Sequence, residues 1–150
     1  MAIQTFKANA SLKDNVLVET EARGHKLIID EPKNLGGSDK GMSPIEVVLA
    51  GLGACQSIVA RLYADKFEIN LKDFSVDVEG ELDTDGFLGK SNARPGFSTI
   101  RYTYNIETDA SEKNVDAFIK HVEQNCPVGD SLANEVNLIP GKIIIKNPVK

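Results

Sequence analysis

The sequence is poor in the residues that bind metals or join chains covalently. Its 150 residues include two cysteines, two histidines and no tryptophan. Cys55 and Cys126 are far apart, and neither His25 nor His121 lies at the close spacing of a structural zinc site. We therefore expect no metal centre and no bound cofactor.

The chain also lacks an excess of positive charge. Seventeen Lys and Arg against 22 Asp and Glu give a formal net charge of −5. Binding to nucleic acid needs a concentrated basic face, so this class of partner is disfavoured. No run approaches the roughly 20 apolar residues that span a bilayer, and the first residues lack the basic-then-apolar pattern of a secretory signal. We expect a cytoplasmic protein that binds neither membranes nor nucleic acids.

What the sequence does contain is the pattern of a single α+β domain over residues 1–150. Hydrophobic residues make up 41% of the chain and charged residues 26%, as in ordinary globular proteins. Alternating apolar and polar residues predict strands, and apolar residues at helical spacing predict helices. The strands are expected at 3–9, 15–22, 25–30, 74–82, 98–108 and 137–145. The helices are expected from the Ser43 cap to about Phe67, at 111–125 and at 127–134.

Residues 43–46 (Ser-Pro-Ile-Glu) predict the start of the longest helix, because they combine a capping box with proline at the first helical position. Along this helix Cys55 lies in the middle of an apolar stripe, which we expect to be the buried face. Gly51 and Gly53 each cost about 1 kcal/mol relative to alanine inside a helix, so they suggest close packing against another backbone.

Physical reasoning about the two cysteines leaves alternatives open. Cys126 immediately precedes Pro127 at an expected helix start, where free N–H groups and the positive dipole end favour a thiolate. Burial in the apolar face would raise the pKa of Cys55. On this basis Cys126 is the more reactive thiol, although both residues could equally be small, unrelated members of the core. A permanent disulfide is not expected in a reducing cytosol.

Several segments resemble the OsmC/Ohr family, in the same order and with matching spacing. They are 24–32 (GHKLIIDEP), 35–37 (LGG), Ser43-Pro44 leading into 49–55 (LAGLGAC), and 125–128 (NCPV) followed by Leu132. The resemblance implies an OsmC-like fold and an intertwined homodimer, in which two central cysteine-bearing helices pack on sheets and each active site lies at the subunit interface. It also implies thiol-dependent reduction of organic hydroperoxides in oxidative-stress defence, with hydrogen peroxide as a second candidate substrate.

The resemblance also implies roles for individual residues. Cys55 matches the thiol that attacks the peroxide and Cys126 its resolving partner, which reverses the ranking reached from burial alone. An external dithiol would then reduce the resulting disulfide. The family places an activating arginine in the N-terminal region, and Arg23, in the turn before the strand that begins Gly24-His25, is the nearest arginine to that region.

The sequence departs from the family's pattern directly after Pro44. The family's peroxidases carry a glutamate there that orients the arginine, whereas this chain has Ile45. Glu46 is about 100° further round the helix and is explained by the capping box. We therefore predict an OsmC-like relative outside the narrow organic-hydroperoxide branch. Two alternatives stay open: a non-enzymatic dimer that binds a small apolar ligand, and a redox sensor that uses the same thiols.

Overall fold

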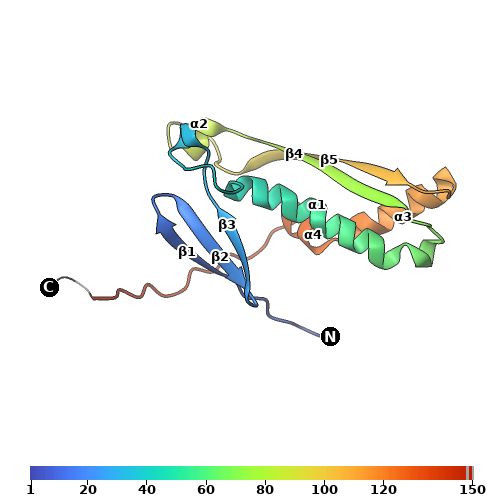
Figure 1. Ribbon diagram of the computed structural model, residues 1–150, viewed down its shortest axis with the longest axis horizontal. Coiled ribbons are helices and arrows are strands. Elements are labelled where there is room, and N and C mark those ends of the chain that lie inside the picture. The colour runs from blue at the N-terminus through green and yellow to red at the C-terminus, as the bar shows by residue number, and fades with distance from the viewer. Residues whose placement is uncertain (148, 150) are drawn as a thin grey trace.

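The computed structural model describes residues 1–147 and residue 149, and it has an α+β fold with two separate antiparallel sheets (Figure 1). The strands are β1 (Asn9–Asp14), β2 (Leu17–Ala22), β3 (His25–Ile29), β4 (Asp73–Leu82) and β5 (Phe97–Glu107). The helices are α1 (Pro44–Tyr63), α2 (Thr84–Phe87), α3 (Glu112–Gln124) and α4 (Pro127–Ala133), with 3-10 turns η1 (Lys33–Leu35) and η2 (Asp65–Phe67). The sheet β1–β2–β3 stands away from the layer that α1 forms with β4 and β5.

The core lies where α1 packs against β4 and α3. Its buried apolar side chains are Val59, Ala60, Ala64, Ile69, Leu71, Phe118 and Val122. Phe118 and Val122 are fully buried and lie four positions apart on α3, so they share one face of that helix. The helical spacing that predicted α3 therefore also identified its buried face correctly.

The start of α1 has the predicted capping box. The N–H of Ser43 donates to Oε2 of Glu46 at 2.7 Å, and the N–H of Glu46 donates to Oγ of Ser43 at 3.4 Å. Pro44 occupies the first helical position, where no N–H is needed. The α-helix ends earlier than predicted, at Tyr63, because the chain tightens into η2 and Glu68 adopts a left-handed conformation with φ 55°.

Asp30 anchors the loop that leads from β3 to α1. Asp30 is 1% exposed. Its carboxylate accepts hydrogen bonds from the N–H groups of Glu31, Ser38 and Lys40 at 2.8, 3.1 and 3.1 Å. Burial alone would raise the pKa of Asp30, but these hydrogen bonds and the charge of Lys40 hold it below its ordinary value. The charged form of Asp30 thus fixes the conformation of this loop through three hydrogen bonds.

Two of the predicted strands are wrong. The strand predicted at 3–9 is absent, and the first strand is β1, which begins at Asn9. The strand predicted at 137–145 is also absent. Within the described residues neither segment is paired with another strand, and a strand needs a neighbour to satisfy its backbone groups. Their large apolar side chains are exposed: Ile3, Phe6, Leu138, Ile139, Ile143, Ile144 and Ile145. The other four strands and all three predicted helices are present.

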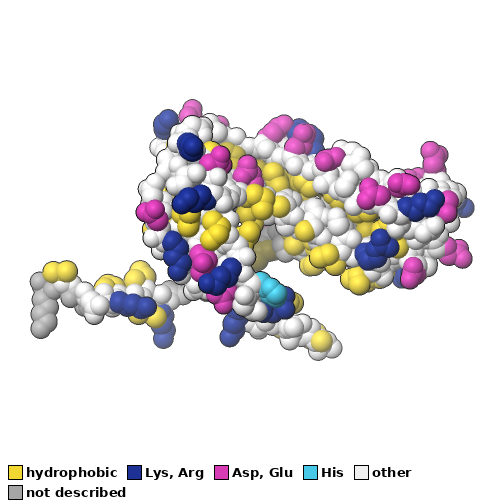
Figure 2. Space-filling model, viewed as in Figure 1, with side chains coloured by type: hydrophobic (Ala, Val, Ile, Leu, Met, Phe, Trp, Pro, Cys, Tyr) yellow, Lys and Arg dark blue, Asp and Glu magenta, His cyan; other side chains and the backbone are white. Residues whose placement is uncertain are grey.

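The buried face of α1 is also rotated from the expected one. The buried residues of this helix are Leu52, Gly53, Gln56, Val59 and Ala60. The stripe around Cys55 is instead exposed at Val48, Ile58 and Leu62, and Cys55 is half-buried at its edge. Figure 2 shows hydrophobic side chains at the surface along the α1 layer. We call these three exposed residues the apolar stripe of α1.

In the described part of the chain, α1 is the one helix long and apolar enough to cross a membrane by length and composition. The expectation that no segment approaches such a length and apolarity is therefore wrong. Core helices of globular proteins meet the same criterion, and here α1 packs against β4, α3 and α4.

Candidate active site

Cys55 and Cys126 come from different elements but lie close together. Cys55 is on α1, and Cys126 is the N-cap residue of α4, which packs against α1. The two are free thiols, and Cys55 is near enough to raise the pKa of Cys126. The fold therefore brings together the two cysteines that the sequence singled out.

The thiol of Cys126 is held in a buried position. The residue is 1% exposed, and the N–H of Gly129 donates to its Sγ at 3.3 Å. Burial raises the pKa of Cys126; the hydrogen bond from Gly129 opposes this shift, and neighbouring Cys55 adds to it. The pKa of Cys126 is therefore raised overall. The expectation of a lowered pKa, based on its place at a helix start, is wrong because desolvation outweighs the helix end.

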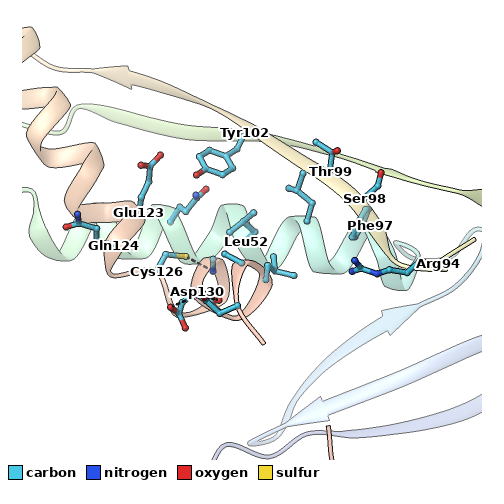
Figure 3. Close-up of a pocket in the computed structure, with 16 residues that line it drawn as sticks. Leu52, Arg94, Phe97, Ser98, Thr99, Tyr102, Glu123, Gln124, Cys126 and Asp130 are labelled. Carbon is cyan, nitrogen blue, oxygen red and sulfur yellow. Dashed lines mark hydrogen bonds between the residues drawn. The ribbon is translucent and has the colours of Figure 1, made fainter. Parts of the chain in front are cut away.

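A cavity of about 580 Å³ lies beside Cys126, between α1, β5 and the helices α3 and α4 (Figure 3). Its apolar wall includes Leu52, Phe97, Ile100 and Leu132. Its polar wall includes Gln56, Arg94, Tyr102, Glu123 and Asp130. Glu123 and Asp130 lie at the end of the cavity near Cys126, whereas Arg94 lies at the opposite end. The site is thus elongated and carries opposite charges at its two ends.

Buried polar groups near this cavity lack partners. Gln56 is 2% exposed, and its Oε1 has no hydrogen bond within the described structure; the same holds for the buried hydroxyl of Tyr104. Burial, followed by the carboxylate of Glu123, raises the pKa of both Tyr102 and Tyr104. The two phenols therefore stay protonated well into alkaline pH. Unpartnered buried polar atoms of this kind are usually satisfied by a water molecule or a ligand.

The predicted arginine is not brought to the thiols within one chain. Arg23 lies exposed in the β2–β3 turn with φ 54°, and it does not line the cavity beside Cys126. Of the chain's four arginines, all in described residues, only Arg94 lines that cavity. Arg61 donates to the carbonyl of Leu71 at 3.2 Å, and Arg101 pairs with Glu81 at 2.6 Å. The role of Arg23 stays a prediction.

Sequence reasoning missed Gln56 and Arg94. Gln56 could have been noticed, because it is a polar residue directly after Cys55 in an otherwise apolar helix segment. Arg94 lies in the irregular segment between α2 and β5, where no periodicity indicates the direction of a side chain. Within the described residues, no group of three or more His, Cys, Asp or Glu side chains could hold a metal ion.

The family model for OsmC-like proteins matches residues 37–140, and the chain belongs to this family. Its similarity to a solved OsmC-like protein from Mycoplasma pneumoniae confirms the OsmC-like α+β fold: identity is 24%, the TM-score is 0.77, and 87% of this chain and 88% of that one are covered. An organic hydroperoxide resistance protein OsmC from Legionella pneumophila is 25% identical with a TM-score of 0.62, over 88% of this chain and 91% of that one.

Two relatives are named hydroperoxide reductase. The one from Mycoplasma pneumoniae is 29% identical over 96 residues, which cover 62% of this chain and 63% of that protein. This match spans less than two thirds of the relative's length. The one from Mycoplasma genitalium is 24% identical over 136 residues, which cover 88% of this chain and 89% of that protein.

Proposed function

We propose that the protein is a thiol-dependent peroxidase that reduces organic hydroperoxides, with Cys55 and Cys126 as its catalytic pair. The observation that carries the proposal is the proximity of these two free thiols across the α1–α4 contact. The hydroperoxide reductase names of two relatives agree with it. Hydrogen peroxide is a second candidate substrate.

The reaction proceeds in two steps on the protein. The Cys55 thiolate attacks one oxygen of the O–O bond; the other oxygen leaves as an alcohol, and Cys55 becomes a sulfenic acid. The Cys126 thiol then displaces the sulfenic hydroxyl, which leaves as water with the thiol proton, and a disulfide forms. An external dithiol reduces this disulfide and restores both thiols. A bridge requires Cα atoms within about 7 Å, so the proximity of the thiols supports this step.

The proposed active form is a homodimer of one-domain chains. Three features of a single chain support this: the exposed apolar stripe of α1, and the unpaired apolar segments at each end, 3–8 and 137–145. A second copy could cover all three. In such a dimer the β2–β3 turn of one chain would bring Arg23 to Cys55 of the other, where the guanidinium would stabilise the thiolate. The proposed setting is the cytoplasm, in defence against oxidative stress.

Rapid-mixing measurement of thiol loss with cumene hydroperoxide tests the function. We expect the reduced protein to lose thiols much faster than free cysteine, and Cys55→Ser to lose this reactivity. Cys126→Ser is the matched control, because it keeps the attacking thiol and should retain the fast first oxidation. A rate no faster than that of free cysteine would overturn the proposal.

A second candidate, a non-enzymatic dimer that binds a small apolar ligand, is favoured by one observation. Ile45 stands where the family's peroxidases carry a glutamate, and Glu46 is occupied by the helix cap. A redox sensor that uses the same two thiols is the third candidate function. It predicts mixed disulfides with other proteins instead of repeated turnover with a small dithiol, so trapping with Cys126→Ser separates it from the peroxidase.

A further inference from the structure

We propose that the cavity beside Cys126 is the entry site of the thiol reductant, and that it selects neutral or cationic thiols over anionic ones. The inference rests on the proposed peroxidase cycle and assigns a place and a charge preference to its reducing step. Four observations support it. The cavity is lined by Cys126 and not by Cys55, and Cys55 is the better leaving group of the two sulfurs. The buried amide of Gln56 has an unpartnered oxygen, and the two ends of the cavity carry opposite charges.

The cavity is lined by Cys126, one of the two cysteines of the pair. Cys126 is among the described residues that line it and Cys55 is not. Cys126 is otherwise buried, with 1% of its surface exposed. A thiolate that enters the cavity therefore meets the Sγ of Cys126 first. The half-buried Cys55 lies at the edge of the apolar stripe of α1 and does not line this cavity.

The leaving-group rule of thiol–disulfide exchange also favours attack on the sulfur of Cys126. In thiol–disulfide exchange the sulfur whose thiol has the higher pKa is the poorer leaving group. Burial raises the pKa of Cys126, which makes it a poor leaving group and a suitable target. The reductant thiolate forms an S–S bond to Cys126, the Cys55–Cys126 bond breaks, and Cys55 leaves as a thiolate. A second reductant thiol then attacks the reductant sulfur, gives its proton to the departing Cys126, and leaves the reductant oxidised to a disulfide.

The wall of the cavity contains a buried acceptor without a donor. Gln56 lines the cavity, is 2% exposed, and its Oε1 has no hydrogen-bond partner. Leaving a buried acceptor unsatisfied is costly, so the site favours a ligand that carries a hydrogen-bond donor. A hydroxyl or an ammonium group can donate to Gln56. A carboxylate or a sulfonate cannot.

The charges at the reacting end are negative. Glu123 and Asp130 lie at the Cys126 end of the cavity, and Arg94 lies at the far end (Figure 3). Carboxylates beside a confined site repel anions and concentrate cations. A small anionic thiol, and a peptide thiol with two carboxylates, would therefore reach Cys126 less readily than a neutral or cationic thiol.

Three small monothiols of similar size test this preference: cysteamine, 2-mercaptoethanol and 2-mercaptoethanesulfonate. The protein disulfide is formed with one equivalent of cumene hydroperoxide. Its reduction is then followed by quenched-flow thiol counting at low ionic strength and equal thiolate concentrations. We expect cysteamine to react about tenfold faster than the sulfonate, with 2-mercaptoethanol between them, and salt to reduce the difference.

Charge-neutral variants locate the effect. Glu123→Gln is expected to narrow the cysteamine-to-sulfonate ratio to about threefold, because one of the two carboxylates is removed. Glu112→Gln is the matched control: it makes the same change at the first turn of α3, outside the cavity, and should leave the ratio unchanged. Gln56→Leu should slow reduction by cysteamine and 2-mercaptoethanol several-fold and leave the sulfonate rate nearly unchanged.

Equal rates for the three thiols in the wild-type protein would overturn the inference, as would an equal loss of preference in Glu123→Gln and Glu112→Gln. Failure of the peroxidase proposal is a separate result, since it appears as slow thiol loss with cumene hydroperoxide. In that case the disulfide is formed with diamide, and the same three thiols still test the cavity.

Discussion

The thiol of Cys126 lies close to Cys55 because Cys126 caps α4, and α4 packs against the helix α1 that carries Cys55. Cys126 caps α4, and the N–H of Gly129 fixes its Sγ at 3.3 Å. The side chain is therefore held in place before any oxidant arrives. The raised pKa keeps Cys126 a thiol, which carries the proton that must leave with the sulfenic hydroxyl when the disulfide forms.

The first prediction concerns overoxidation. With excess cumene hydroperoxide, wild-type protein should stop at the disulfide, whereas Cys126→Ser should gain one oxygen and then a second, because nothing condenses with the sulfenic acid. Intact-mass spectrometry distinguishes the loss of two hydrogens from the gain of oxygen. Cys55→Ser is the control and should gain no oxygen. Turnover of Cys126→Ser at the wild-type rate with dithiothreitol would contradict the assigned role of Cys126.

Local signals in the sequence were sufficient for the elements that carry the thiols. Ser43 with Glu46 determines where α1 begins, and Pro127 determines where α4 begins, since both depend on residues within one helical turn. The direction of burial could not be predicted in the same way. Periodicity identifies an apolar face of a helix but not which neighbour covers it, so Cys55 was placed mid-face instead of at an edge.

Non-local features explain the remaining differences. The segments 3–9 and 137–145 have strand-forming residues, but a strand exists only where another strand pairs with it. The cavity beside Cys126 joins residues from α1, β5 and α3, together with Arg94 from an irregular segment. No spacing along the chain indicates that Gln56 and Glu123 share its wall. The family resemblance predicted the cysteine pair but not this cavity.

The second prediction concerns the apolar stripe of α1. Ile58 is 61% exposed and Leu62 is 72% exposed, which is unusual for large side chains on a central helix. If a second copy covers them, Ile58→Glu with Leu62→Glu should place unpaired charges in the interface and yield monomers. Light scattering after size exclusion measures this. Lys120→Glu, an exposed change on α3, is the control and should leave the dimer intact. A monomeric wild-type protein would contradict the homodimer.

The third prediction concerns the contact between α1 and β4. A Cβ at Gly53 would lie 3.3 Å from Cγ2 of Val78, whereas a Cβ at Gly51 would meet nothing within 4 Å in the chain. Gly53→Leu should therefore lower the free energy of unfolding by about 1–3 kcal/mol through overpacking. Gly51→Leu is the matched control and should be tolerated. Urea unfolding of both variants is measured in the Ile58→Glu, Leu62→Glu background, where contacts between chains are removed. An equal loss of unfolding free energy in the two variants would show that the β4 contact is not the cause.

The fourth prediction concerns Asp30 and pH. Because the pKa of the folded carboxyl lies below that of the unfolded one, about 3.9, its stabilisation is present above that pH and is lost as the pH falls through the folded value. Asp30→Asn removes the charge and replaces one of the two acceptor oxygens with an NH2 group, which cannot accept a hydrogen bond from the backbone N–H groups on its side. It should therefore lower the free energy of unfolding near neutral pH.

The difference between Asp30→Asn and the wild-type protein should shrink as the pH falls below about 4, because the wild-type carboxylate becomes protonated. Urea unfolding across this range measures it. Asp39→Asn makes the same change at an exposed position of the same loop and should have little effect at any pH. An equal loss of unfolding free energy in Asp30→Asn and Asp39→Asn would contradict this role of the carboxylate. So would a loss in Asp30→Asn that does not change with pH. Either result would mean that the Asp30 carboxylate does not anchor the loop before α1.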